Sequence, residues 1–174
     1  RMVENHARPG GGQRFRRSTM KLYLVQHGEA CSKEVDPRRP LSEQGRADIE
    51  RLAAFLGKAG VRVERVMHSG KLRAVQTAQI LSQTIAPGVE AEESGLLNPN
   101  DDPRAFDWQS DAWDRDTLIA GHLPFMAKLV SHLLIEREEP VLVAYRPGTV
   151  VCLEREGAGL WEIDWMIRPE LLGR

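Results

Sequence analysis

The sequence has few of the features that mark secreted, membrane-spanning or metal-binding proteins. Only two of its 174 residues are cysteine, and Cys31 and Cys152 stand alone without a CxxC pair. We expect reduced thiols rather than a disulfide or a zinc site. No apolar run approaches the roughly 18 residues of a membrane helix, and no apolar signal segment opens the chain. These absences predict a cytoplasmic protein that does not enter a membrane.

The chain also lacks a net charge of any size. It has 24 Lys and Arg against 25 Asp and Glu, for a net charge of −1. Residues 1–19 hold five Arg, one Glu and a Pro-Gly-Gly-Gly run, and such a segment cannot bury enough apolar surface to fold. We expect residues 1–19 to be a disordered tail or an extension from cloning or start-site choice. Residues 20–174 have the size of a single domain and no basic patch, so nucleic acid is not expected as a partner.

What the sequence does have is an alternation of apolar strands and amphipathic helices. Strands are predicted at 21–25, 61–68, 117–121, 141–143, 149–154 and 160–167, with the last two joined as a hairpin. Helices are predicted at 43–59, at 71–85, from 122–124 onward, and as a short segment that includes Phe106 and Trp113. This order predicts an α/β three-layer sandwich with a mostly parallel central sheet and no large lid.

Polar residues gather where three of these strands end. The turns are Gln26-His27-Gly28-Glu29, His68-Ser69-Gly70 with Arg73 just beyond, and Gly121-His122. Ligands of open α/β sheets bind outside the carboxyl ends of parallel strands, so the three turns are expected to share one crevice. Histidine and arginine suit phosphate better than a metal ion, because guanidinium donates to phosphate oxygens and neutral imidazole is a nucleophile. We expect neither metal nor cofactor.

Four motifs in this order resemble a known family. They are Leu24-Val-Gln-His-Gly-Glu29, Arg39-Pro-Leu-Ser42 with Gly45, Ser69-Gly-Lys-Leu-Arg-Ala-Val-Gln-Thr-Ala78, and Gly121-His-Leu-Pro124. Together they are similar to the signatures of the histidine phosphatase superfamily, which has the phosphoglycerate-mutase-like fold, and the resemblance spans residues 20–172. The GHLP form and the short chain resemble the SixA-type phosphohistidine phosphatases in particular.

The resemblance implies a role for each matched residue. His27 would attack phosphorus and become a phosphohistidine, Arg73 would bind the phosphoryl oxygens, and His122 would donate a hydrogen bond to the transition state. Arg38 could take the place of Arg39 in binding phosphate. The residues expected to bind phosphate besides Arg73 are Gln26, Gly28, Arg39 and Ser69.

The chain departs from the family motif at Gln26, where the superfamily has arginine. An amide donates a hydrogen bond without positive charge, so we expect weaker phosphate binding. Either Arg73, Arg39 or Lys33 supplies enough charge for catalysis, or the chain binds phosphate without turning it over. Activity is favoured because both histidines and Arg73 are intact.

The sequence does not identify a proton donor for the leaving group. Glu29 is a possible donor, and Glu93, Asp101 and Asp102 are further candidates. A phosphohistidine substrate relaxes this need, because a free imidazole has a pKa of about 6.5 and protonates easily. The segment 93–117 is too short for a large lid, which leaves the crevice open to a protein. We expect a phosphohistidine-bearing protein domain of histidine-phosphotransfer signalling as partner, with a small phosphomonoester as the alternative and the oligomeric state left open.

Overall fold

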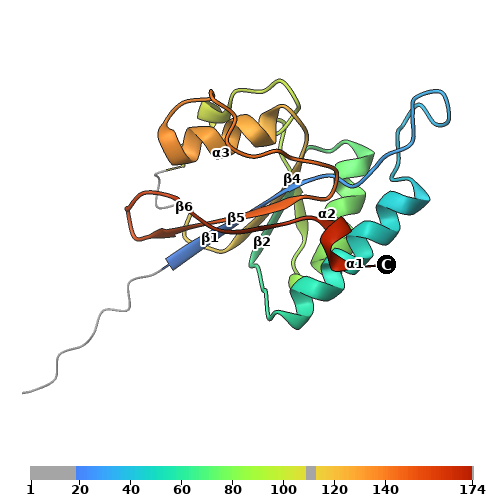
Figure 1. Cartoon of the computed structure of the whole chain (residues 1–174), viewed down its shortest axis with the longest axis horizontal. Helices are drawn as coiled ribbons and strands as arrows, with labels where there is room; N and C mark the ends of the chain where they lie inside the picture. The colour runs from blue at the N-terminus through green and yellow to red at the C-terminus, as the bar shows by residue number, and fades with distance from the viewer. Residues whose placement is uncertain (1–18, 109–112, 174) are drawn as a thin grey trace, which may run out of the picture.

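The computed structural model describes residues 19–108 and 113–173, which form a six-stranded sheet between two layers of helices (Figure 1). The strands lie in the order β3-β2-β4-β1-β5-β6. The elements are β1 (Thr19–Gln26), α1 (Glu43–Lys58), β2 (Arg65–His68), α2 (Leu72–Ile85), β3 (Ala91–Glu93), the 3-10 helix η1 (Pro103–Ala105), β4 (Thr117–Gly121), α3 (Phe125–Ile135), β5 (Val150–Glu156), β6 (Glu162–Ile167) and the 3-10 helix η2 (Pro169–Leu172).

The four strands β3, β2, β4 and β1 run parallel, whereas β5 is antiparallel to β1 and β6 antiparallel to β5. The register places Gln26 beside Gly121 and His68 beside Ala120. The carboxyl ends of β1, β2 and β4 therefore lie together at one edge of the sheet. The predicted α/β sandwich with a mostly parallel sheet is confirmed.

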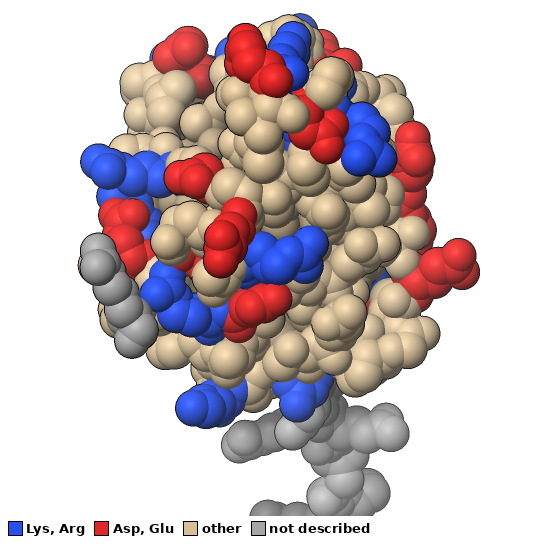
Figure 2. Space-filling view, turned by 90° about the vertical axis from the view of Figure 1, so that its right-hand side faces the viewer, with Lys and Arg blue, Asp and Glu red and all other residues tan. Residues whose placement is uncertain are grey.

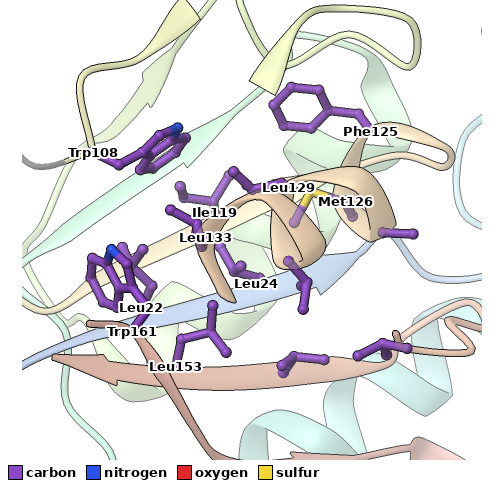
Figure 3. Close-up of a cluster of buried hydrophobic side chains, with 14 of the residues drawn as sticks. Leu22, Leu24, Trp108, Ile119, Phe125, Met126, Leu129, Leu133, Leu153 and Trp161 are labelled. Atoms are coloured by element: carbon purple, nitrogen blue, oxygen red, sulfur yellow. The ribbon is translucent and has the colours of Figure 1, made fainter. Parts of the chain in front are cut away.

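Alternate side chains of β1 build the two cores. Leu22 and Leu24 face α3, where they pack with Phe125 and Leu129 (Figure 3). Tyr23 and Val25, which alternate with these leucines along the strand, point to the other face, which α1 and α2 cover in Figure 1. Because β1 is buried on both faces, its sequence is an almost continuous apolar run. Each fully buried leucine contributes about 2 kcal/mol of hydrophobic stabilisation.

Local sequence signals determine where the helices next to the site begin. Ser42 caps α1 as predicted, since its Oγ accepts the N–H of Gly45 at 3.0 Å. Gly70 has φ +82°, a backbone conformation that glycine adopts without strain, and it turns the chain sharply from β2 into α2. Arg73 consequently lies in the first turn of α2.

Several predicted boundaries were wrong. The segment 141–143 pairs with no strand; Val141 and Leu142 are 48% and 44% exposed, and β5 begins only at Val150. The strand predicted at 61–68 is shorter, because the N–H of Val63 donates to Ile85 rather than to a neighbouring strand. The short edge strand β3 was missed, and the helix expected near Phe106 is the 3-10 turn η1. No helix of the described residues is both long and apolar enough to cross a membrane.

Candidate active site

The structure brings two of the three polar turns, together with the Arg73 that follows the third, around one pocket of about 450 Å³ at the carboxyl ends of the strands. Gln26 and His27 reach it from the end of β1, and His122 reaches it from the end of β4. Arg73 enters from the first turn of α2, and Arg39 from the loop after β1. Residues 95 positions apart in the sequence therefore share one site, as the strand-end argument predicts.

His27 is held in one tautomer. Its Nδ1 lies 2.7 Å from the carbonyl oxygen of Gly28, and because a carbonyl only accepts, Nδ1 carries the proton. The lone pair is left on Nε2, which accepts a hydrogen bond from Nε of Arg73 at 3.2 Å. Burial lowers the pKa of His27 to about 4, with Arg73 and Arg39 adding to the effect and the Gly28 carbonyl opposing it. The ring is a neutral imidazole at neutral pH, and its nucleophilic nitrogen is Nε2, whose lone pair is hydrogen-bonded to Arg73.

His122 lies beside His27, with the ring centroids 5.0 Å apart and the planes tilted by 56°. Its Nε2 is 2.6 Å from Oγ of Ser69, while its buried Nδ1 has no hydrogen-bond partner among the described residues. Burial, followed by repulsion from His27 and Arg73, lowers the pKa of His122 to about 3. A neutral ring with one unpaired nitrogen can form one further hydrogen bond with a ligand.

The two arginines of the pocket have no acidic partner. Neither Arg73 nor Arg39 forms an ion pair within the described residues, and burial together with the charge of Arg39 lowers the pKa of Arg73. A bridge between Ala30 and Leu41 closes the base of the loop that carries Arg39, whose Nε donates to the carbonyl of Cys31 at 3.1 Å. Two unpaired guanidinium groups beside a nucleophile form an anion site.

Arg38 and Arg39, between which the sequence left a choice, lie in different places. Arg39 has φ +50° and lines the pocket. Arg38 is outside the pocket wall, and its guanidinium bonds to the carboxylate of Asp36. A non-glycine residue in the left-handed region is strained, and such strain is often found at functional sites.

The loop after His27 is fixed by contacts that use its backbone. The N–H of Gly28 donates to Oγ1 of Thr77 at 3.0 Å, so this amide, expected to bind phosphate, is used inside the protein. A Cβ on Gly45 would lie 2.0 Å from the carbonyl oxygen of Glu29. The glycine of the second motif thus lets the loop pack directly on α1.

Sequence reasoning gave no role to Gln76 and Thr77, which follow Arg73 by three and four residues. Oε1 of Gln76 accepts the N–H of Leu41 at 2.8 Å, and Thr77 holds Gly28 as described. The spacing was the available signal, because positions i+3 and i+4 lie on the same side of a helix as position i. One face of α2 therefore presents an arginine and two residues that bond to the backbone of Gly28 and Leu41.

Two other expected phosphate-binding residues have distinct surroundings. Ser69 contacts His122 and does not line the pocket. Gln26 does line it, but its side chain is only 8% exposed and its Oε1 has no partner among the described residues. The position that holds arginine in the family motif thus has an uncharged, buried amide in this chain.

The four candidate proton donors also differ in whether they line the pocket. Glu29 lines the pocket, and its Oε1 accepts a hydrogen bond from Oγ of Ser42 at 2.6 Å. Asp101 accepts the N–H of Asn98, and Asp102 forms an ion pair with Arg104. Neither acid lines the pocket. Glu93 lies beside Gly70, also outside the pocket wall. Of these four carboxylates, Glu29 is the one that lines the pocket.

The surface around the pocket carries charges of both signs. Figure 2 looks onto the carboxyl ends of the strands and shows Lys and Arg interspersed with Asp and Glu over that face. Within residues 19–108 and 113–173, no group of three or more His, Cys, Asp or Glu could hold a metal ion. The charge that favours an anion comes from within the pocket rather than from a broad basic surface.

Comparison with known proteins agrees with this geometry. The family model of the histidine phosphatase superfamily (branch 1) matches residues 22–96, which include His27 and Arg73. Phosphohistidine phosphatase SixA of Escherichia coli (strain K12) is 26% identical over 155 residues, covering 86% of this chain and 94% of SixA. The chain is thus similar to members of the histidine phosphatase superfamily over the part that holds His27 and Arg73. The predicted class of enzyme, a phosphatase, is that of its matched relatives.

One further relative and two solved structures extend the comparison. Mouse serine/threonine-protein phosphatase PGAM5 is 27% identical over 101 residues, which are 55% of this chain and 35% of PGAM5. The structure of the protein histidine phosphatase SixA complexed with tungstate has a TM-score of 0.77 at 23% identity and covers 88% of this chain and 100% of its own. Phosphoglycerate mutase from Bacillus anthracis has a TM-score of 0.68 at 12% identity, covering 90% and 96%. These two structures establish the shared fold.

Proposed function

We propose that this chain is a phosphohistidine phosphatase that carries the phosphoryl group on His27 during turnover. The observation that carries the proposal is the state of the His27 ring. Its Nδ1 proton is bound to the Gly28 carbonyl, and its Nε2 lone pair lies beside Arg73 in a pocket that has two unpaired guanidinium groups. This arrangement supports attack by Nε2 on phosphorus, since the arginines attract the phosphoryl oxygens and the ring is unprotonated.

The reaction takes place in two steps. In the first, the lone pair of His27 Nε2 forms a bond to phosphorus while the bond from phosphorus to the substrate's imidazole nitrogen breaks, and that imidazole takes up a proton. In the second, water attacks phosphorus and the bond to His27 Nε2 breaks, which releases inorganic phosphate and a proton. Arg73 and Arg39 stay with the phosphoryl oxygens throughout, and His122 donates to the charge that develops on them.

The leaving group is the reason to prefer phosphohistidine. Release of an alkoxide needs a positioned acid, whereas an imidazole with a pKa of about 6.5 can leave with a proton from solvent. Of the four acids considered, only Glu29 lines the pocket, and its Oε1 is already bound to Ser42. The likeness to phosphohistidine phosphatase SixA supports the same substrate class. We propose a histidine-phosphotransfer domain as the partner that presents it.

One observation favours a second candidate function. Gln26 replaces a cation with an uncharged amide in the pocket wall, and weaker binding of the transition state could leave a module that binds phosphate without turnover. A small-molecule phosphomonoesterase is the remaining alternative, and it would require Glu29 to act as the acid.

The test is release of phosphate from a phosphohistidine protein without added metal, by wild type, His27→Ala and the control His132→Ala. His132 lies on α3, outside the pocket. We expect wild type and the control to turn over and His27→Ala to be inactive; full activity of His27→Ala would refute the proposal. A parallel panel of sugar, nucleotide and cofactor phosphates separates the phosphomonoesterase, and binding without turnover of every substrate identifies the non-catalytic module.

A further inference from the structure

Ser69 and His122 form a buried polar pair behind the pocket. Oγ of Ser69 lies 2.6 Å from Nε2 of His122, and the two residues are 6% and 1% exposed. Ser69 follows the end of β2 and His122 follows β4, so the parallel pairing of these strands sets the contact. Ser69 does not line the pocket, so it would influence a bound phosphoryl group indirectly, and its shorter contact is with the His122 ring.

The direction of this hydrogen bond follows from the other partner of Ser69. Its Oγ accepts the backbone N–H of Lys71 at 3.4 Å, so the hydroxyl proton remains to be placed. Among the described residues, Oγ of Ser69 has one hydrogen-bond partner that can accept this proton, and that partner is Nε2 of His122. A buried hydroxyl that donates to no acceptor is unfavourable, which favours donation to Nε2.

The two tautomers of His122 differ in the number of polar groups they leave unpaired. With the proton on Nε2, that N–H donates to Ser69, and both the hydroxyl proton and the Nδ1 lone pair lack a partner. With the proton on Nδ1, the hydroxyl donates to Nε2, and a single N–H at Nδ1 is left. Nδ1 is the buried ring nitrogen without a partner among the described residues. An anionic ligand in the neighbouring pocket can satisfy an N–H at this position but would repel a lone pair.

We propose that Ser69 is a positioning residue that fixes His122 in the tautomer protonated at Nδ1, so that Nδ1–H is a donor for the oxygens of a phosphoryl group on His27. The catalytic consequence rests on the proposed function, whereas the tautomer is a property of the free protein. The proposal also gives Ser69 a role different from the phosphate contact that its place in the third motif implies.

The direct test is long-range ¹H–¹⁵N NMR of the free protein labelled at histidine. The signals of His122 are identified as those missing from His122→Gln. We expect Nδ1 to have the shift of a protonated nitrogen and Nε2 that of an unprotonated one, and we expect this preference to weaken in Ser69→Ala. A wild-type spectrum with the proton on Nε2 of His122 would overturn the proposal, and no variant of Ser69 is needed for that result.

Kinetics with the phosphohistidine protein test the consequence. Loss of a partner that orients a metal-bound histidine lowers activity about 10- to 100-fold, and by analogy we expect kcat of Ser69→Ala to fall by a similar factor with KM changed less than threefold. Ser69→Thr keeps the hydroxyl and should restore most of kcat. Equal kcat for wild type and Ser69→Ala would contradict the proposal. If the wild type turns over no phosphohistidine substrate, the proposed function fails, and the NMR spectrum still decides the tautomer.

Discussion

The two ends of the parallel sheet each have a pocket, and the larger pocket lies at the end without the histidines. At the amino ends of the strands, a pocket of about 620 Å³ is walled by apolar side chains that include Tyr23, Phe55 and Trp165. At the carboxyl ends, the pocket of about 450 Å³ contains His27, Arg73 and other polar groups. Volume alone would select the amino-end pocket, which no histidine lines.

The difference between the two ends follows from the direction of the strands. β1 and β4 bring Gln26, His27 and His122 to the carboxyl end, where helix α2 begins and adds Arg73. The amino end receives Lys21 and the residues before β2 and β4. Lys21 is already neutralised there, since its Nζ lies 2.6 Å from Oδ2 of Asp164. Arg62 also lines the amino-end pocket and forms no ion pair within the described residues, so the two ends differ in their histidines and not in the presence of an unpaired cation.

The largest expected effect is that of His27→Ala. Removal of a nucleophile commonly costs several orders of magnitude, so kcat for phosphate release from a phosphohistidine protein should fall by at least about 10⁴-fold. His132→Ala is the matched control and should keep kcat within twofold. Loss of activity in both variants would point to misfolding rather than to loss of the nucleophile. Circular dichroism would detect such misfolding.

Arg73→Met should follow in size. This change removes a charged donor to the phosphoryl oxygens, and loss of one such donor lowers kcat about 10²- to 10³-fold. Arg39→Met should also lower kcat/KM, whereas Arg38→Met should not, because Arg38 bonds to Asp36 outside the pocket. Equal loss in the Arg38 and Arg39 variants would show that general surface charge, and not the pocket, attracts the substrate.

Acid should destabilise the fold through the two histidines. Their pKa values are about 4 for His27 and about 3 for His122, below the ordinary value of about 6.5 in the unfolded chain. The unfolded state therefore binds more protons as pH falls from 6.5, and the free energy of unfolding decreases by about 2 kcal/mol per ring between pH 7.5 and 4.5. Urea unfolding at both pH values should show a smaller acid loss in His122→Gln than in wild type. An equal loss in the two proteins would contradict the low pKa of His122.

Gln26→Arg should tighten phosphate binding by about tenfold, because a charged hydrogen bond is stronger than a neutral one by about 1 kcal/mol or more. Calorimetric titration with inorganic phosphate at low salt measures the change, and Gln26→Met controls for the substitution of a buried side chain. A gain in kcat/KM of similar size would mean that Gln26 weakens catalysis. An unchanged Kd would mean that Arg39 and Arg73 already supply the charge.

The smallest effect belongs to the amino-end pocket. Phe55 lines that pocket and is 44% exposed, so Phe55→Ser should leave kcat/KM within twofold of wild type in the phosphate-release assay. A drop of tenfold or more would mean that the two ends are coupled, and the contrast between them would need to be revised.

The sequence predicted the fold where apolar pattern and turn chemistry agreed. Strand β4 was predicted with its observed bounds, and α1 was predicted with its cap at Ser42. The prediction from sequence failed at β3, because its residues Ala-Glu-Glu have no apolar strand pattern. This strand is held in place by its pairing with β2. The prediction also failed at 141–143, because a short apolar run does not indicate whether a neighbouring strand edge is free.

For the candidate site, the sequence predicted which strand ends converge but not how each side chain is used. The pairing of β1 with β4 and of β4 with β2 is enough to bring His27, Ser69 and His122 together. Whether Ser69 faces the pocket or the ring of His122 depends on side-chain geometry that no spacing encodes. The same holds for the backbone of Gly28, which is bound to Thr77 instead of being free for phosphate.

The most direct test of the central claim is capture of the phosphorylated enzyme. Wild-type protein is mixed with a ³²P-labelled phosphohistidine protein, quenched in alkali within the first turnover, digested and mapped by mass spectrometry, with His27→Ala and His122→Gln alongside. We predict label on the peptide that contains His27 in wild type and in His122→Gln, and none in His27→Ala. Turnover by wild type without label on His27, or label retained in His27→Ala, would contradict the account.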